Sequence, residues 1–164
     1  AALSLYLSQS PQSLVARRAL ANLQLAAREW PDAVDTLGWL NDGVGANDAL
    51  IQAQLAYALT AAGDPQTALA HARIAYRLAP MNPAATDAFG WALYEQGDTR
   101  AALEVLQKAA TLAPNHAGIS WHLGQALADA GRSAEARQRI TAALRDPRFA
   151  DRAPATALLK LLGS

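Results

Sequence analysis

The chain repeats itself every 34 residues, and this repetition restricts its possible folds more than any other feature. Aligned on itself at that shift, the chain matches in five independent columns. The columns are Gly63, Gly97 and Gly131; Leu59, Leu93 and Leu127; Ala68, Ala102 and Ala136; Ala75, Ala109 and Ala143; and Pro80 with Pro114. A fixed period of this length is typical of stacked repeats, in which each unit covers the apolar side of its neighbour.

Each unit carries the signals of two helices joined by a tight turn. Asn82 and Pro83 suit the N-cap and the first turn of one helix. Gly97 ends that helix where a left-handed residue is needed, Asp98 can cap the next helix, and Pro114 stops it. The chain also contains 41 Ala and 25 Leu among 164 residues. Because both residues are strong helix formers, the composition favours an all-helical fold.

Small residues occupy one column of the first helix in three units. They are Ala56, Gly90 and Gly124. With no side chain or only a methyl group in this column, the backbones of two helices can approach closely. We therefore expect the two helices of each unit to be in direct contact at these positions.

The period and its residues resemble the tetratricopeptide repeat, a 34-residue helix–turn–helix unit. The matching residues are Phe89, Gly90, Leu93, Ala102, Leu106 and Pro114 in one unit, Leu123, Gly124, Leu127, Ala136 and Ile140 in the next, and Leu55, Ala56, Leu59, Ala68 and Pro80 in the preceding one. Two columns differ, because the opening Trp column holds Gln52, Thr86 and Ser120 and the Tyr column holds leucine. The resemblance covers residues 14–146 and implies an all-α, right-handed α-solenoid.

The register assigns residues 1–164 to a single solenoid domain. Repeats are expected at 14–48, 49–82, 83–116 and 117–146, with the end of a truncated repeat at 1–13 and a capping helix at 151–162. Leu3, Tyr6 and Leu7 match the end of a second helix, which indicates a fragment of a longer array. The repeat at 14–48 is the most divergent, since Arg28 stands where glycine is expected and its closing loop, around Gly43-Val44-Gly45, has one extra residue.

The C-terminal segment predicts a capping helix and points to a narrower family. The helix is expected to begin at Asp151 and to turn Ala157, Leu158, Leu161 and Leu162 inward. The stretches Phe149-Ala150-Asp151-Arg152-Ala153 and Ala157-Leu158-Leu159-Lys160 resemble the C-terminus of the tetratricopeptide-repeat lipoproteins of the PEP-CTERM/exosortase system. This resemblance implies a lipid-anchored protein of the bacterial periplasm or envelope, linked to exopolysaccharide and protein sorting. A cytoplasmic location stays open.

Charge and residue types argue against several functions. The 14 Lys and Arg balance 14 Asp and Glu, which disfavours nucleic acid as a partner, and no apolar run reaches the ~20 residues of a membrane helix. The chain has no cysteine, and His71, His116 and His122 do not converge by spacing, so we expect solvated or capping histidines and no metal or cofactor. Asp87 and Glu95 lie two turns apart with no His or Lys at a matching spacing. We therefore expect no enzyme.

The family register places ten residues on the concave side of the predicted solenoid, where partners bind. They are Arg18, Asn22, Tyr57, Asp87, Trp91, Tyr94, Glu95, Trp121, Gln125 and Asp129. Aromatic side chains make good anchors because they bury a large rigid area and keep a polar atom. For Trp91 and Trp121, packing between successive helices is an open alternative. Trp30, Trp39 and Tyr76 are assigned to packing.

Some tetratricopeptide arrays hold the acidic C-terminal tail of a chaperone in a clamp, which Arg18 and Asn22 resemble in part. The later clamp positions hold Gln54, Ala84 and Ala88, so no cation is available there and we reject this partner. From about residue 50 the predicted groove is apolar, aromatic and mildly acidic, and residues 49–62 contain no charge. These features favour a protein or peptide with apolar anchors and some basic residues.

The prediction is thus a non-catalytic scaffold that binds a peptide segment or a partner helix. Two alternatives stay open. The chain is a structural solenoid that self-associates through the half-repeat near Leu3 and Leu7, or an accessory protein that contacts polysaccharide through Trp91, Tyr94 and Trp121.

Overall fold

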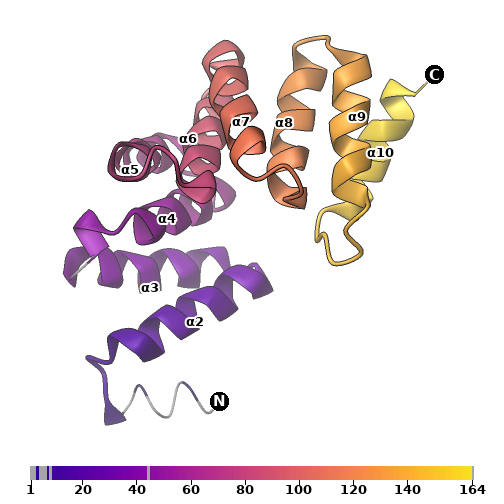
Figure 1. Cartoon of the computed structure of the whole chain (residues 1–164). Helices are drawn as coiled ribbons and strands as arrows, with labels where there is room; N and C mark the ends of the chain where they lie inside the picture. The colour runs from indigo at the N-terminus through magenta and orange to yellow at the C-terminus, as the bar shows by residue number, and fades with distance from the viewer. Residues whose placement is uncertain (1–2, 4–6, 8, 44, 164) are drawn as a thin grey trace.

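The computed structural model describes residues 3, 7, 9–43 and 45–163, and these contain nine α-helices and no strand (Figure 1). The helices are α2 (Leu14–Ala27), α3 (Trp30–Gly43), α4 (Ala49–Ala61), α5 (Pro65–Leu78), α6 (Pro83–Glu95), α7 (Thr99–Leu112), α8 (Ala117–Asp129), α9 (Ser133–Leu144) and α10 (Arg152–Leu162). A 3-10 turn, η1 (Gly45–Asn47), lies between α3 and α4. The expected all-α fold is confirmed. The half-repeat predicted from Leu3, Tyr6 and Leu7 lies mostly outside the described residues.

The helices are arranged as successive pairs that follow one another around a curve (Figure 1). Helices α2 and α3, α4 and α5, α6 and α7, and α8 and α9 pack within pairs, and α3–α4, α5–α6 and α7–α8 contacts join each pair to the next. The first helices α4, α6 and α8 also contact one another in sequence. This arrangement is an α-solenoid, with α10 packed on α9 at its end.

The predicted caps begin and end these helices. The Asn82 side chain accepts hydrogen bonds from the N–H groups of Ala84 and Ala85 at 2.9 and 3.1 Å, which stabilises the start of α6 by about 1 kcal/mol. Gly63, Gly97 and Gly131 have φ angles of +90°, +85° and +74°. Arg28 ends α2 with φ +59°, so a non-glycine residue adopts the same left-handed conformation at a cost of roughly 1–2 kcal/mol.

The column of small residues lies where paired helices touch. A Cβ on Gly90 would stand 2.7 Å from Leu106 Cγ and 3.0 Å from the Leu106 backbone nitrogen. A Cβ on Gly124 would stand 2.8 Å from Ile140 Cγ1. The expected close approach is therefore confirmed for α6 with α7 and for α8 with α9.

Buried side chains form a series of clusters along the solenoid. Leu37 and Leu40 belong to a cluster between the first two pairs, and Leu106 and Leu123 belong to one between the last two pairs. Ile140 lies in a terminal cluster with α10. Each cluster is shared by neighbouring pairs, so the stability of one pair depends on the next.

Helix α10 covers the end of the solenoid, but its orientation differs from the expected one. Ala155 is fully buried, and Leu158, Leu159 and Leu162 pack on the terminal cluster with it. Leu161 is 81% exposed and Ala157 is exposed, so their predicted inward position is wrong. The inward residues Ala155, Leu158, Leu159 and Leu162 follow the i, i+3, i+4, i+7 spacing of one helix face, and Ala157 and Leu161 lie outside that face. Within the described residues, no helix is long and apolar enough to cross a membrane.

Candidate binding groove

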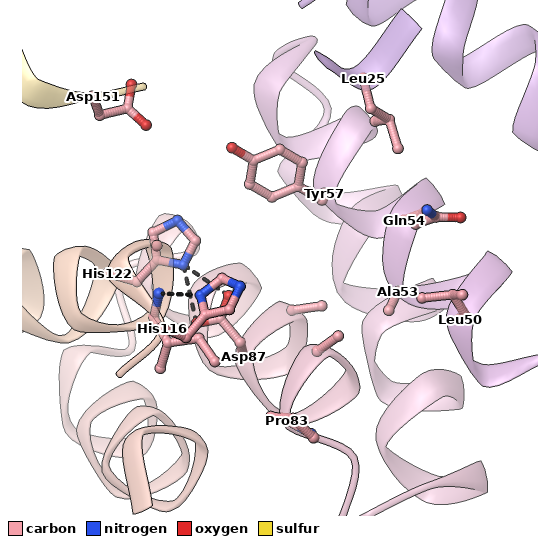
Figure 2. Close-up of a pocket in the computed structure, with 14 residues that line it drawn as sticks. Leu25, Leu50, Ala53, Gln54, Tyr57, Pro83, Asp87, His116, His122 and Asp151 are labelled. Atoms are coloured by element: carbon pink, nitrogen blue, oxygen red, sulfur yellow. Dashed lines mark hydrogen bonds and ion pairs between the residues drawn. The ribbon is translucent and has the colours of Figure 1, made fainter. Parts of the chain in front are cut away.

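Two adjoining recesses lie on the side of the solenoid formed by the first helices. We call the first the apolar recess (Figure 2). It has a volume of about 300 Å³. Its lining residues are Leu25, Leu50, Ala53, Gln54, Tyr57, Pro83, Ala84, Asp87, Ala88, His116, Gly118, Ile119, His122 and Asp151. Most of them come from α4, α6 and α8, whose small or aliphatic side chains leave this space unfilled.

We call the second space the aromatic recess, because four aromatic side chains, one from each helix pair, line it. Its volume is about 390 Å³. The lining residues are Arg28, Trp30, Tyr57, Thr60, Ala61, Trp91, Glu95, Trp121, His122, Gln125, Asp151 and Pro154. Tyr57, His122 and Asp151 line both recesses, so the two spaces are neighbours.

A chain of ring contacts runs through the groove and joins four helices. Trp30 meets Tyr57 edge-to-face with ring centroids 5.7 Å apart, and Tyr57 lies 6.2 Å from His122. Trp91 stacks on His122 at 4.2 Å and on Tyr94 at 5.0 Å. Each such pair contributes about 0.5–1.5 kcal/mol beyond the area it buries, so the groove is held in one shape.

His122 is fixed by a carboxylate from the preceding repeat. Its Nδ1 lies 2.9 Å from Asp87 Oδ2, and the exposed fractions of the two side chains are 9% and 13%. This contact holds the ring, and Figure 2 shows the other ring nitrogen pointing away from Asp87. The expectation that histidines are solvated or capping is therefore wrong for His122. The residues are 35 apart in the sequence and meet only because repeats stack.

The other two histidines have structural contacts. His116 Nδ1 accepts a hydrogen bond from the Ile119 N–H at 3.3 Å, which confirms a capping role at the start of α8. His71 lies 2.7 Å from Gln52 Oε1, and partial burial lowers the pKa of His71. Among the described residues, no group of three or more His, Cys, Asp or Glu side chains converges as a metal site requires.

An ion pair joins the first helix pair to the capping helix. Arg28 Nη2 at the end of α2 lies 2.6 Å from Asp151 Oδ1 at the start of α10, across 123 residues of sequence. This hydrogen bond raises the pKa of the Arg28 guanidinium. Because both residues line the aromatic recess, the pair connects the two ends of the described solenoid beside the groove. The Asp151 side chain makes this contact and does not cap the N-terminus of α10 with a hydrogen bond.

Glu95 is the acid of the aromatic recess that no described residue pairs with. No hydrogen bond or ion pair to its carboxylate is found among the described side chains. Partial burial raises the pKa of Glu95, and nearby His122 opposes that shift only in part. Glu95 is exposed, so a ligand that enters the recess can reach its carboxylate.

Six of the ten predicted residues line the two recesses. They are Tyr57, Asp87, Trp91, Glu95, Trp121 and Gln125. The other four line neither recess and bind other side chains of the same protein. Arg18 binds Asp48 at 2.7 Å, Asn22 accepts from Gln54 at 2.9 Å, and the Tyr94 hydroxyl donates to Asp129 at 2.5 Å. Burial and the contact with Asp129 raise the pKa of Tyr94.

The aromatic residues divide between the groove and the packing. Trp121 is only 7% exposed, and its ring centroid lies 6.3 Å from that of Phe149. Most of the Trp121 surface is therefore packed against neighbouring side chains. Trp39, beneath the Arg17 guanidinium at 4.0 Å, and Tyr76, stacked on Phe89 at 5.1 Å, are packing residues as expected.

Four of the eight aromatic or charged residues that line the aromatic recess were not predicted from the sequence. Trp30, assigned to packing, also lines the aromatic recess, as do His122, Arg28 and Asp151. The 35-residue separation of Asp87 and His122, close to one repeat, was the only available signal for any of them.

The comparisons with known proteins agree with this architecture. Residues 93–161 match the family model of the tetratricopeptide repeat. No protein of curated function matches the chain in sequence. The helix pairs, their arrangement around a curve and the solved structures of similar fold together define an α-solenoid of the tetratricopeptide-repeat type.

Three solved structures illustrate the similarity. TTC0263, a thermophilic tetratricopeptide-repeat protein of Thermus thermophilus, is 22% identical with a TM-score of 0.77, over 96% of this chain and 87% of that one. YrrB, described as having an unusual peptide-binding site, is 20% identical with a TM-score of 0.65, over 98% and 82%. The Yersinia enterocolitica secretion chaperone SycD, solved with a peptide of the translocator YopD, is 16% identical with a TM-score of 0.58, over 68% and 88%.

Proposed function

We propose that the chain is a non-catalytic scaffold that binds a peptide segment of a partner protein in the groove. The observation that carries this proposal is the apolar recess of about 300 Å³ on α4, α6 and α8. Solenoids bind extended segments and helices along such surfaces, because burial of apolar side chains drives association. Two proteins of similar fold also support it, since YrrB is described with a peptide-binding site and SycD was solved with a peptide.

A substitution that fills the apolar recess tests this proposal. Ala84 is exposed and lines the recess, so the indole of Ala84→Trp would occupy the space with little effect on the fold. Ala70→Trp places the same side chain at an exposed position of the outer helix α5 and serves as the control.

The measurement starts from random dodecapeptides displayed on phage and selected on the wild-type chain. One recovered peptide is then titrated by calorimetry against the wild type and both variants. We expect Ala84→Trp to weaken binding at least about tenfold and Ala70→Trp to leave it unchanged. Equal affinities for all three chains would show that the peptide binds outside the apolar recess.

We further infer that this scaffold works in the bacterial envelope, in exopolysaccharide or protein sorting. The inference rests on the resemblance of residues 149–153 and 157–160 to the PEP-CTERM/exosortase-system lipoproteins. Phe149, which is buried, and Arg152, which donates to the carbonyl oxygens of Leu144 and Asp146 at 2.8 and 2.7 Å, also have packing roles. Fractionation of the source cells with an antibody to this chain is the test, and recovery in the cytoplasm alone would contradict it.

A further inference from the structure

Three carboxylates line the two recesses, and two of them have a side-chain partner. Asp151 is paired with Arg28 at 2.6 Å, and Asp87 is paired with His122 at 2.9 Å. Glu95 lines the aromatic recess, and no described residue supplies a partner for its carboxylate. A ligand that enters this recess therefore meets a carboxylate that has no side-chain partner among the described residues.

The walls of the aromatic recess select among cations. Trp30, Tyr57 and Trp91 contribute aromatic surface to it, and Glu95 contributes the free carboxylate. A guanidinium is planar and weakly hydrated, stacks on aromatic rings, and binds a carboxylate through two parallel hydrogen bonds. A lysine ammonium is strongly hydrated and lacks the planar fork. The recess already contains one guanidinium of its own chain, that of Arg28, on Asp151.

We propose that the aromatic recess binds an arginine side chain of the peptide partner, with its guanidinium on the Glu95 carboxylate and its stem against the aromatic walls. A nearby aliphatic side chain of the same peptide enters the apolar recess. The two recesses share Tyr57, His122 and Asp151, so one short segment reaches both. This inference rests on the proposed function and adds the chemistry of the partner to it.

Two further observations agree with a cationic ligand. The Glu95 side chain is exposed, so its carboxylate is accessible to a ligand, and partial burial raises its pKa. A bound guanidinium would stabilise the charged form of this carboxylate. An acidic peptide, in contrast, would place its carboxylates against Glu95, with Arg28 already engaged by Asp151.

The first test compares three selections from the same library of displayed random dodecapeptides. The baits are the wild type, Glu95→Gln and Glu104→Gln. Glu104 is exposed on α7 and lines neither recess, so its variant matches the change in net charge. We expect wild-type and Glu104→Gln selections to be enriched in arginine near an aliphatic residue, and the Glu95→Gln selection to lose the arginine enrichment.

The second test measures the pairing itself. One peptide recovered on the wild type is synthesised with arginine, lysine or citrulline at the enriched position; citrulline keeps the shape but carries no charge. We expect citrulline to weaken binding to the wild type and to Glu104→Gln by about tenfold to a hundredfold, and lysine to weaken it less. On Glu95→Gln the arginine and citrulline peptides should bind nearly equally.

The outcomes separate this inference from the proposed function. If recovered peptides are weakened by Ala84→Trp but show no arginine preference, or keep that preference on Glu95→Gln, the arginine site is wrong and the peptide groove stands. If no peptide is recovered, or if recovered peptides ignore both Ala84→Trp and Glu95→Gln, the groove and the arginine site both fail. Circular dichroism of each variant confirms that the helices are intact.

Discussion

Gly90 shows how one residue sets the distance between two helices. A Cβ at this position would lie 2.7 Å from Leu106 Cγ and 3.0 Å from the backbone nitrogen of Leu106. Unlike a flexible side chain, the Leu106 backbone cannot move aside by changing its rotamer. We expect Gly90→Ala to lower the free energy of unfolding by about 1–3 kcal/mol, because α6 and α7 must separate. Urea unfolding followed by circular dichroism measures this change.

Gly124→Ala is the matched comparison for this prediction. Its Cβ would meet the flexible side chain of Ile140 at 2.8 Å but the backbone nitrogen of Ile140 only at 3.5 Å. Ile140 can therefore adjust, and the gain in helix propensity of up to about 1 kcal/mol offsets much of the cost. Equal losses for the two variants would mean that contact with the backbone does not decide the effect.

The N-terminus of α4 gives a prediction about pH at the scale of the element. Partial burial would raise the pKa of Asp48, but hydrogen bonds from Arg18 at 2.7 Å and from the N–H groups of Ile51 and Leu50 outweigh burial and lower it. Asp48→Asn keeps a capping side chain and removes the charge. We expect the variant to be less stable at pH 7 by less than about 1 kcal/mol.

The wild type and Asp48→Asn should become equally stable in acid. A lowered carboxyl pKa contributes stability above the unfolded value of about 3.9, and this contribution is lost as pH falls through the lower folded value. Thermal unfolding at intervals between pH 7 and about pH 2 should show a constant difference down to about pH 5 that then shrinks. A difference that persists undiminished at the lowest pH would contradict this account of Asp48.

The ends of the helices were predictable from the sequence, whereas contacts between repeats were not. Caps such as Asn82 and turn residues such as Gly97 act within about four residues, so local sequence contains their whole signal. The contact of His122 with Asp87 depends on how repeats stack, which no local pattern contains. The inward face of α10 was readable, because its inward residues follow the i, i+3, i+4, i+7 spacing from Ala155 to Leu162, but the prediction chose a different set.

Adjacent leucines of α10 test the rotation that the structure assigns. Leu162 packs against two buried clusters, whereas Leu161 is 81% exposed. We expect Leu162→Ala to cost about 1–3 kcal/mol of unfolding free energy and Leu161→Ala to change it by less than about 0.5 kcal/mol. Chemical denaturation measures both variants, and similar losses for the two would support the orientation predicted from the sequence, in which both leucines face inward.

At the scale of the whole molecule, the ion pair of Arg28 and Asp151 holds the two ends of the solenoid together. The exposed fractions of the two side chains are 46% and 25%, so the pair adds less than about 1 kcal/mol to stability. Its effect should appear in shape, because the contact spans 123 residues that otherwise communicate only through stacked repeats. Asp151→Ala is the preferred change, since Arg28 also occupies a left-handed backbone position that a substitution would disturb.

Distances between spin labels on α2 and α10 measure this shape directly. The chain has no cysteine, so Leu23→Cys and Thr156→Cys at exposed positions provide the labelling sites. We expect Asp151→Ala, or 1 M salt on the otherwise unchanged chain, to broaden the distance distribution, because no other ion pair of the described residues joins α2 to α10. Glu135→Ala, which removes a local ion pair within α9, should leave the distribution unchanged. An unaltered distribution in Asp151→Ala would mean that helix stacking alone sets the width of the groove, and that peptide entry requires no opening of this contact.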